Sequence, residues 1–281
     1  IKTCEILAHG TEEPALFRSR FDFVQELAPW HLTQARPQLG SPGEGATRHW
    51  EAIPNFVDTD VFRPSEGLEE QQECRRRMGI PESAFVIGCV AAVKREHKRI
   101  DYLLREFASY LAASGETNTV LLIAGSRQPD TDGLLALAET LAPGRIMFKC
   151  DAGRSDMPDL YRSMDVFVLP SLFEMMPIAG LEAMASGIPL ITHEHPVLKW
   201  MLGDDGRPVG LCSDISQEGN LAALFGAVTD SWRLECGQGA RERACSEFSV
   251  SVVVERYVAY YHTVIRETLN QGDPYGIGID A

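Results

Sequence analysis

The stretch that decides the fold is DVFVLPSLFEMMPIAGLEAMASGIPLI, residues 165–191. It opens with an apolar run at 165–170, passes through a turn into a helix-like segment at 177–187, and returns to an apolar run at 188–192. Continuous apolar runs of this length predict strands that are buried on both faces. A strand, a helix and a second strand in this order predict a βαβ unit of a parallel sheet.

The same alternation extends back toward residue 80. Several of the helix-like segments end on a glycine, at Gly79, Gly115, Gly144 and Gly187, as a left-handed helix cap requires. Further strands are predicted at 85–93, 119–125 and 145–150, and helices at 68–78, 101–115, 132–144 and 155–164. This repeated alternation is typical of a doubly wound α/β fold built on a parallel sheet.

The flanking regions follow a poorer pattern. Residues 21–29 predict one more strand, and the segment 36–49 is rich in Gly, Pro and Ser, which indicates a surface loop. The punctuated segment AIPNFVDTDVFRP at 52–64 indicates a crossing between domains. Helical spacing of apolar residues predicts a long C-terminal helix over 249–269.

The composition excludes several classes of protein. The 281 residues include 40 acidic and 26 basic side chains, which gives a formal charge of −14 and argues against a nucleic-acid partner or a coat on an anionic membrane. Seven cysteines without a CxxC pair argue against a disulfide framework and predict a reducing, cytoplasmic setting. The longest apolar run, at 85–93, is too short for a transmembrane segment, while peripheral membrane contact stays open.

Two stretches carry side chains suited to chemistry. KREHKR at 94–99 directly follows a predicted strand, and Lys and Arg at the carboxyl end of a strand suit a phosphate. A solvated loop with incidental charge is the alternative. In the second stretch, Glu174 follows a predicted strand and Pro177 takes the first helical position.

The helix that starts there predicts an anion site between two carboxylates. The first amides, from about Ile178 onward, point into the crevice, and Glu182 lies one turn beyond Ile178 on the same face. Because carboxylates repel phosphate but accept hydrogen bonds from sugar hydroxyls, Glu174 and Glu182 suit a sugar at each end of a diphosphate. The expected ligand is a nucleotide sugar. A turn residue and a partly exposed helix residue are the alternatives for these two glutamates.

These motifs resemble those of the family-4 retaining glycosyltransferases, which have the GT-B fold. FEMMPIAGLEAMASGIPLI resembles their E-x7-E signature, with Glu174 and Glu182 as the two glutamates. LYRSMDVFVLPS at 160–171 resembles the strand that precedes this signature in the family, and the segment 52–64 resembles the family's interdomain segment. The resemblance covers residues 52–265 in order. It implies a partial N-terminal Rossmann-like domain at 1–57, a complete C-terminal Rossmann-like domain with a doubly wound parallel sheet at 58–250, and a helix at 251–270 crossing back to the N-terminal domain.

The resemblance also implies roles for single residues. Glu174 would bind hydroxyls of the donor sugar, Glu182 would bind the ribose, and Lys98 would neutralise the diphosphate. The backbone around Met176, Ile178 and Ala179 would approach the sugar and the diphosphate.

Other positions depart from the family pattern or are less specific. The family places an Arg five or six residues before the lysine, where this chain has Val93 and Ala92, and Lys94 is the candidate substitute. An ammonium, however, is a point charge rather than a bidentate fork. Cys150 and Gly153 would border the base. His9 is the candidate for a cleft histidine near the reacting carbon, with a plain loop histidine as the alternative.

The expected activity is transfer of a sugar, with retention, from a nucleotide-diphosphate sugar to an unspecified acceptor: a glycan, a lipid or a small molecule. No cofactor and no metal are expected, because His193 and His195 lack a third ligand in the sequence. The short N-terminal part and the start at Ile1 predict a truncated chain. A donor-binding fragment without catalysis, or one half of a two-chain enzyme, is the main alternative; an epimerase or a phosphorylase of the same fold is a weaker one.

Overall fold

The computed structural model describes residues 4–6, 23–35, 49–203 and 206–270. The chain forms two compact units, and each has its own parallel sheet. The larger unit comprises residues 56–249, and the smaller one combines residues 1–55 with residues 250–281.

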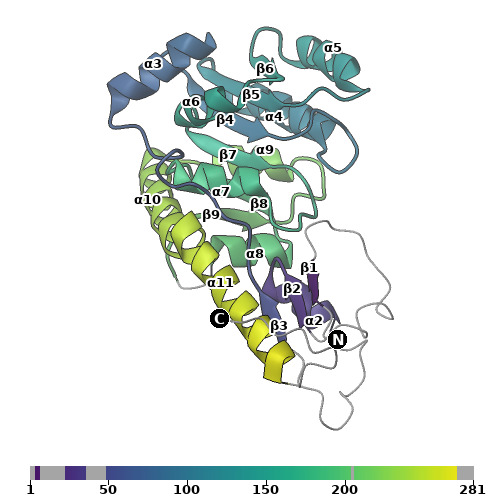
Figure 1. Cartoon of the computed structure of the whole chain (residues 1–281). Helices are drawn as coiled ribbons and strands as arrows, with labels where there is room; N and C mark the ends of the chain where they lie inside the picture. The colour runs from purple at the N-terminus through teal and green to yellow at the C-terminus, as the bar shows by residue number, and fades with distance from the viewer. Residues whose placement is uncertain (1–3, 7–22, 36–48, 204–205, 271–281) are drawn as a thin grey trace. The chain divides into compact units, whose positions relative to one another are not determined.

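The larger unit is built on a six-stranded sheet in which every neighbouring pair is parallel (Figure 1). The strand order is β6-β5-β4-β7-β8-β9, which reverses direction between β4 and β7 and is the doubly wound order of dinucleotide-binding folds. The strands are β4 (Phe85–Val90), β5 (Thr119–Gly125), β6 (Ile146–Cys150), β7 (Val166–Leu169), β8 (Leu190–His193) and β9 (Gly210–Ser213). The fold class predicted from the sequence is therefore confirmed.

Helices connect these strands and cover the sheet. They are α3 (Leu68–Met78), α4 (Ile100–Ser114), α5 (Thr131–Leu141), the short 3-10 turn η2 (Arg154–Asp156), α6 (Met157–Arg162), α7 (Ile178–Ala185), α8 (Pro196–Leu202), α9 (Asn220–Gly226) and α10 (Asp230–Glu247). Helix α4 packs against α5 and α9, whereas α7 packs against α10 and α6 against α3. The main core lies under the first group, where Leu103, Phe107, Leu121 and Ile123 are fully buried.

Most elements predicted from periodicity are present, with shifted ends. Strand β4 stops at Val90 rather than at residue 93. Beyond it the Ala91 and Val93 amides still donate to the Ala124 and Ser126 carbonyls, and the loop that carries the basic residues follows. In this unit, strand β9 and helices α8, α9 and α10 are not among the predicted elements. Strand β9 is short and only half-buried, so it lacks a continuous apolar run. The four predicted glycines all adopt the left-handed conformation, with φ between 68° and 71°.

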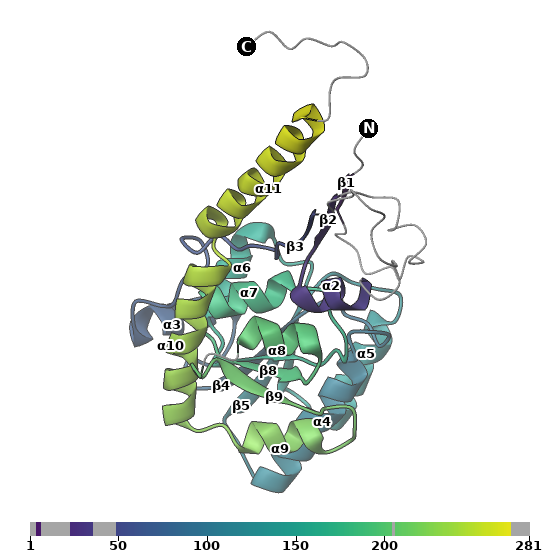
Figure 2. The same cartoon turned by 90° about the horizontal axis from the view of Figure 1, so that it is seen from below.

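The smaller unit contains β1 (Cys4–Ile6), β2 (Phe23–Glu26), β3 (His49–Ala52) and α2 (Pro29–Ala35), with β1, β2 and β3 side by side in parallel (Figure 2). Helix α11 (Val250–Asn270) belongs to this unit. Its Val253 and Tyr260 pack against Phe23 and Ile53, and its Arg256 donates a hydrogen bond to the Ala52 carbonyl. His9 lies outside the described residues.

None of the helices that the structure describes is long and apolar enough to cross a membrane. The described cysteines, Cys74, Cys89, Cys150, Cys212, Cys236 and Cys245, are free thiols. The cytoplasmic setting stays a prediction.

Candidate functional site

The loops that follow β4 and β7 meet where the strand order reverses, which is where open α/β sheets form their ligand crevice. Lys98 comes from the first loop and Glu174 from the second. The Lys98 ammonium donates a hydrogen bond of 2.5 Å to Glu174 Oε1, and the Glu174 side chain is only 9 % exposed. The sequence placed each of these two residues after a predicted strand, and the structure brings them together because β4 and β7 are neighbours in the sheet.

The loop after β4 has an unusual backbone. His97 and Arg99 both adopt left-handed conformations, with φ of 64° and 48°, which are uncommon for residues other than glycine. The Arg99 guanidinium donates hydrogen bonds to the carbonyl oxygens of Pro170, at 3.0 Å, and Ile215, at 2.9 Å. Arg99 therefore ties this loop to the chain beyond β7 and β9, and it holds Lys98 in place rather than facing a ligand.

Two histidines border the turn that carries Glu174. His97 Nε2 lies 2.8 Å from the Phe173 carbonyl oxygen and 3.8 Å from Glu174 Oε1. The His195 ring packs edge-on against the Phe173 ring, with 5.1 Å between centroids. Burial lowers the pKa of His195, the nearby His193 acts in the same direction, and the Glu174 carboxylate opposes it. These contacts fix the turn from two sides.

The second glutamate has a different partner. The Tyr161 hydroxyl, on α6, donates a hydrogen bond of 2.7 Å to Glu182 Oε2, on α7. Burial raises the pKa of Glu182, and the hydrogen bond from Tyr161 and the charge of Arg154 lower it. Burial also raises the pKa of Tyr161 well above its usual value.

Cys89, which is fully buried in β4, links the two pairs. Burial raises the pKa of its thiol to about 12, and the charges of Lys98 and Glu174 both act on it. Cys89 in turn acts electrostatically on Tyr161. Cys89 is therefore coupled electrostatically to members of both pairs.

The start of α7 offers free hydrogen-bond donors. Pro177 has an extended backbone and caps the helix, and its carbonyl accepts from Gly180 and Leu181. The amides of Ile178 and Ala179 donate to no acceptor among the described residues. Unpaired amides at a helix start favour an anion. Met176 as a whole residue is 3 % exposed, so its side chain packs inside the unit.

The remaining predicted residues lie around this centre. Lys94 is half-buried, and its ammonium has no hydrogen-bond or ionic partner in the part of the chain that the structure describes. Val93, where the family would supply an Arg, is fully buried, and its amide donates to the Ser126 carbonyl. Cys150 ends β6, and Gly153 precedes η2. The charge of Arg154, in η2, lowers the pKa of Glu182.

The two histidines of the HEH stretch have structural partners. His193 Nδ1 accepts from the Ile215 amide at 3.3 Å, and His195 Nδ1 accepts from the Val197 amide at 3.3 Å as the N-cap of α8. Within the described ranges, no three His, Cys, Asp or Glu side chains gather in a way that could hold a metal.

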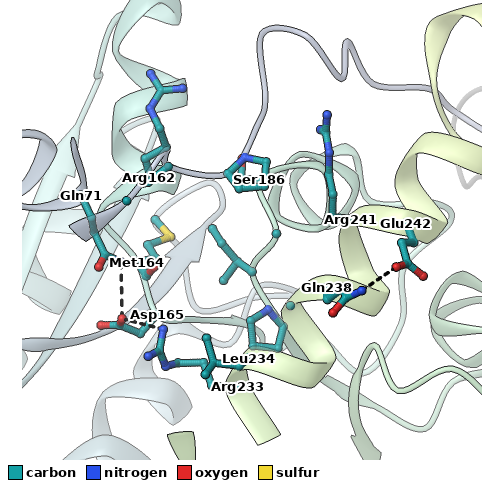
Figure 3. Close-up of a pocket in the computed structure, with 17 residues that line it drawn as sticks. Gln71, Arg162, Met164, Asp165, Ser186, Arg233, Leu234, Gln238, Arg241 and Glu242 are labelled. Atoms are coloured by element: carbon teal, nitrogen blue, oxygen red, sulfur yellow. Dashed lines mark hydrogen bonds and ion pairs between the residues drawn. The ribbon is translucent and has the colours of Figure 1, made fainter. Parts of the chain in front are cut away.

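A cavity of about 610 Å³ lies at the opposite, amino-terminal edge of the sheet, beside Asp165 and Pro189 (Figure 3). Its arginines already have partners. Arg241 Nη1 donates to the carbonyls of Thr59, Phe62 and Ala185; Arg233 lies 3.5 Å from Asp165; and Arg162 donates to Asp159. These charges hold the unit together, so this cavity is not the candidate site.

The family pattern of the glycosyl transferases group 1 matches residues 84–226, about half of the chain. The chain belongs to this family. The matched segment contains Lys98, Glu174 and Glu182, together with the whole six-stranded sheet of the larger unit. The family predicted from the sequence is confirmed, and the chain also has relatives of known name and structure.

The D-inositol 3-phosphate glycosyltransferase of Streptomyces scabiei is 28% identical over 234 residues, which cover 76% of this chain and 51% of that protein. The chain thus spans about half the length of the curated relatives that it matches. Sucrose-phosphate synthase from Thermosynechococcus elongatus is structurally similar, with a TM-score of 0.76, 19% identity, and coverage of 90% of this chain and 61% of that one. Anabaena HepE, solved with UDP and glucose, gives a TM-score of 0.72 at 16% identity, covering 89% and 65%.

Sequence reasoning missed three contributors to this site: Tyr161, Cys89 and His195 as a cap. Tyr161 stands in the quoted segment LYRSMDVFVLPS, yet no local pattern tells which acceptor its hydroxyl meets 21 residues later. Cys89 looks like any small core residue. The roles of the predicted site residues in catalysis stay predictions.

Proposed function

We propose that this chain provides the donor site of a retaining, metal-independent glycosyltransferase that uses a nucleotide-diphosphate sugar. One observation carries the proposal: the Lys98–Glu174 ion pair of 2.5 Å lies at the point where the strand order reverses. A cation and a carboxylate held together there present one group for a diphosphate and one for sugar hydroxyls.

The proposed division of labour follows the chemistry of each group. Lys98 leaves Glu174 to neutralise the diphosphate, and Lys94 and the amides of Ile178 and Ala179 add positive potential. Glu174, released from the lysine, accepts hydrogen bonds from donor-sugar hydroxyls. The half-buried Glu182 accepts from the ribose.

The nucleotide base and the acceptor side need further residues. We assign the border of the base to the backbone at Cys150, which ends β6, and at Gly153, just beyond it. A histidine such as His9, together with the acceptor, would complete the centre.

Transfer breaks the bond between the anomeric carbon and the diphosphate oxygen. Negative charge develops on the leaving diphosphate, and cations and helix amides that already contact the bound diphosphate stabilise it during the reaction. The ammonium groups of Lys98 and Lys94 supply the compensating positive charge, which supports a reaction without a metal. The acceptor hydroxyl then forms its bond to the anomeric carbon on the face that the diphosphate leaves and gives its proton to the departing diphosphate oxygen, so the anomeric configuration is retained.

Two comparisons support this assignment. HepE of Anabaena, which shares the fold, was solved with UDP and glucose, and the D-inositol 3-phosphate relative is named a glycosyltransferase. Because the chain spans about half of such relatives, a donor-binding unit without catalysis, or one half of a two-chain enzyme, is the second candidate.

The test is calorimetric titration with UDP-, GDP- and ADP-hexoses in buffer with and without EDTA. We expect one donor to bind, and Lys98→Ala and Glu182→Ala to weaken it. Lys199→Ala is the matched control, because that ammonium is 56% exposed and lies 3.5 Å from Glu194. Binding that vanishes with EDTA overturns metal independence, and a folded chain that binds no donor overturns the donor site.

A transfer assay decides between the two candidates. With the donor identified, an acceptor panel of glycans, lipids and small polyols is screened, and NMR reads the anomeric configuration of any product. An inverted product overturns the retaining mechanism. Donor binding without transfer to any acceptor favours the donor-binding unit.

A further inference from the structure

We infer that Tyr161 is a positioning residue, which orients the Glu182 carboxylate for the ribose of the donor. The inference rests on the proposed function and adds a residue to it. Tyr161 would never touch the donor and would act only through Glu182.

The first support is the geometry of the contact. Tyr161 lies on α6, before β7, and Glu182 lies on α7, after β7, so the hydrogen bond of 2.7 Å joins two separate crossover helices. The bond uses Glu182 Oε2. The other oxygen, Oε1, has no hydrogen-bond partner among the described residues. It is also not buried, so a ligand can reach it. One carboxylate oxygen is thus held by the protein, and one is left for a ligand.

The second support is the rigidity of Tyr161. Its side chain is fully buried, and its ring packs edge-on against Phe62, with 5.6 Å between centroids, and tilted against Phe167, at 5.8 Å. A ring that is enclosed in this way cannot turn its hydroxyl toward another acceptor. The direction of the Glu182 carboxylate is therefore set by packing that lies away from the ligand.

The third support is electrostatic. Burial disfavours the ionised form of Glu182 and raises its pKa, and the hydrogen bond from Tyr161 opposes this effect. The other groups that bear on the pair are Arg154, from η2, which lowers the pKa of Glu182, and Cys89, from β4, which raises that of Tyr161. Tyr161 thus helps to keep Glu182 ionised and able to accept hydrogen bonds from two hydroxyls.

The experiment compares the unmodified chain with Tyr161→Phe, using the donor identified above and its 2′,3′-dideoxyribose analogue. Phe keeps the ring packing and removes only the hydroxyl. We expect Tyr161→Phe to weaken binding of the normal donor about tenfold, the size expected for a hydrogen bond to a charged group. The same variant should bind the dideoxy analogue as well as the unmodified chain does, because that analogue offers Glu182 nothing to bind.

Two further readouts separate positioning from a general structural effect. The acid side of the binding profile should move to higher pH in Tyr161→Phe, because Glu182 loses a group that keeps it ionised. In addition, Tyr161→Phe should add little to the loss already caused by Glu182→Ala. Tyr110→Phe, on α4, is the matched control and should change neither readout.

The outcomes are distinct. An equal loss for both donors, or full additivity with Glu182→Ala, overturns the positioning role even if the donor binds normally to the unmodified chain. Failure of the unmodified chain to bind any donor overturns the proposed function instead. Thermal melting checks folding, and if Tyr161→Phe does not fold, Tyr161→Met, which fills similar space without a hydroxyl, takes its place in the same comparison.

Discussion

The Lys98 ammonium and the Glu174 carboxylate are joined by a hydrogen bond of 2.5 Å across 76 residues of sequence. Glu174 is nearly buried and Lys98 is 22% exposed, so each charge depends on the other for much of its stabilisation. A diphosphate that attracts the lysine must replace this partner. The pair is therefore both a structural contact and the group that we expect to respond first to a donor.

Replacement of Lys98 by Ala should damage both stability and activity. The change leaves Glu174 partly desolvated without its cation and removes a charge that stabilises the leaving diphosphate. We expect kcat to fall about 100- to 1000-fold, as for loss of one group that stabilises developing charge. Steady-state kinetics measures this effect, and Lys199→Ala should behave as the unmodified chain does. An unchanged kcat would remove Lys98 from the mechanism.

Donor binding should weaken in acid because of Glu182. Its pKa is raised by burial, so it takes up a proton at a higher pH than an exposed glutamate does. Only the ionised carboxylate accepts hydrogen bonds from two hydroxyls. We expect the affinity measured by titration to fall as pH decreases through this raised pKa, and the fall to disappear in Glu182→Gln. A pH profile that is identical in the variant would contradict this assignment.

Glu70 should account for part of the acid lability of the larger unit. Hydrogen bonds from Arg63 and from the Glu66 amide hold the pKa of Glu70 at about 2. Because this pKa is depressed in the folded state, its contribution to stability is present above the ordinary glutamate pKa and is lost as pH falls toward 2. Urea unfolding of Glu70→Gln should show a shallower loss of stability over that range. Glu69→Gln, at the exposed neighbouring position, should keep the original slope.

Gly125 and Gly133 should respond to alanine in opposite directions. Gly125 ends β5 with φ of 151°, and an added Cβ would overlap the Ala91 carbonyl oxygen, at the root of the loop that carries Lys98. We expect Gly125→Ala to lower the free energy of unfolding by at least about 2 kcal/mol and to weaken donor binding. Gly133 lies in α5, where a Cβ meets only the Arg95 guanidinium at 3.6 Å, so Gly133→Ala should stabilise by about 0.5–1 kcal/mol. Chemical denaturation measures both, and equal shifts would contradict the argument.

Predictions from sequence succeeded where local pattern was strong. Strand β5 and helix α3 begin and end where the pattern placed them, because a continuous apolar run and a glycine cap mark their limits. The meeting of Lys98 with Glu174 was anticipated only as a shared sheet edge. The hydrogen bond from Tyr161 to Glu182 could not be anticipated, since it depends on how α6 and α7 pack across β7.

The partners of two histidines could not be predicted from the sequence either. The spacing of His193 and His195 is one that a metal could use, although no metal was expected because a third ligand was lacking. In the structure each accepts a hydrogen bond from a backbone amide, of Ile215 and of Val197 respectively. The spacing of two side chains in a sequence says nothing of the amides that a distant turn or the next helix brings to them. The role of His9 stays a prediction.

By itself, the sequence determined the alternation of strands and helices, the parallel α/β class, and the family signature around Glu174 and Glu182. These properties follow from interactions over a few residues: apolar periodicity, helix caps and turn-forming residues. Only the tertiary structure decided the strand order that reverses between β4 and β7, and with it which charges meet. Tyr161 and Glu182 are 21 residues apart, and Lys98 and Glu174 are 76 apart. Such partners meet through packing and burial, which a pattern over a few residues cannot predict.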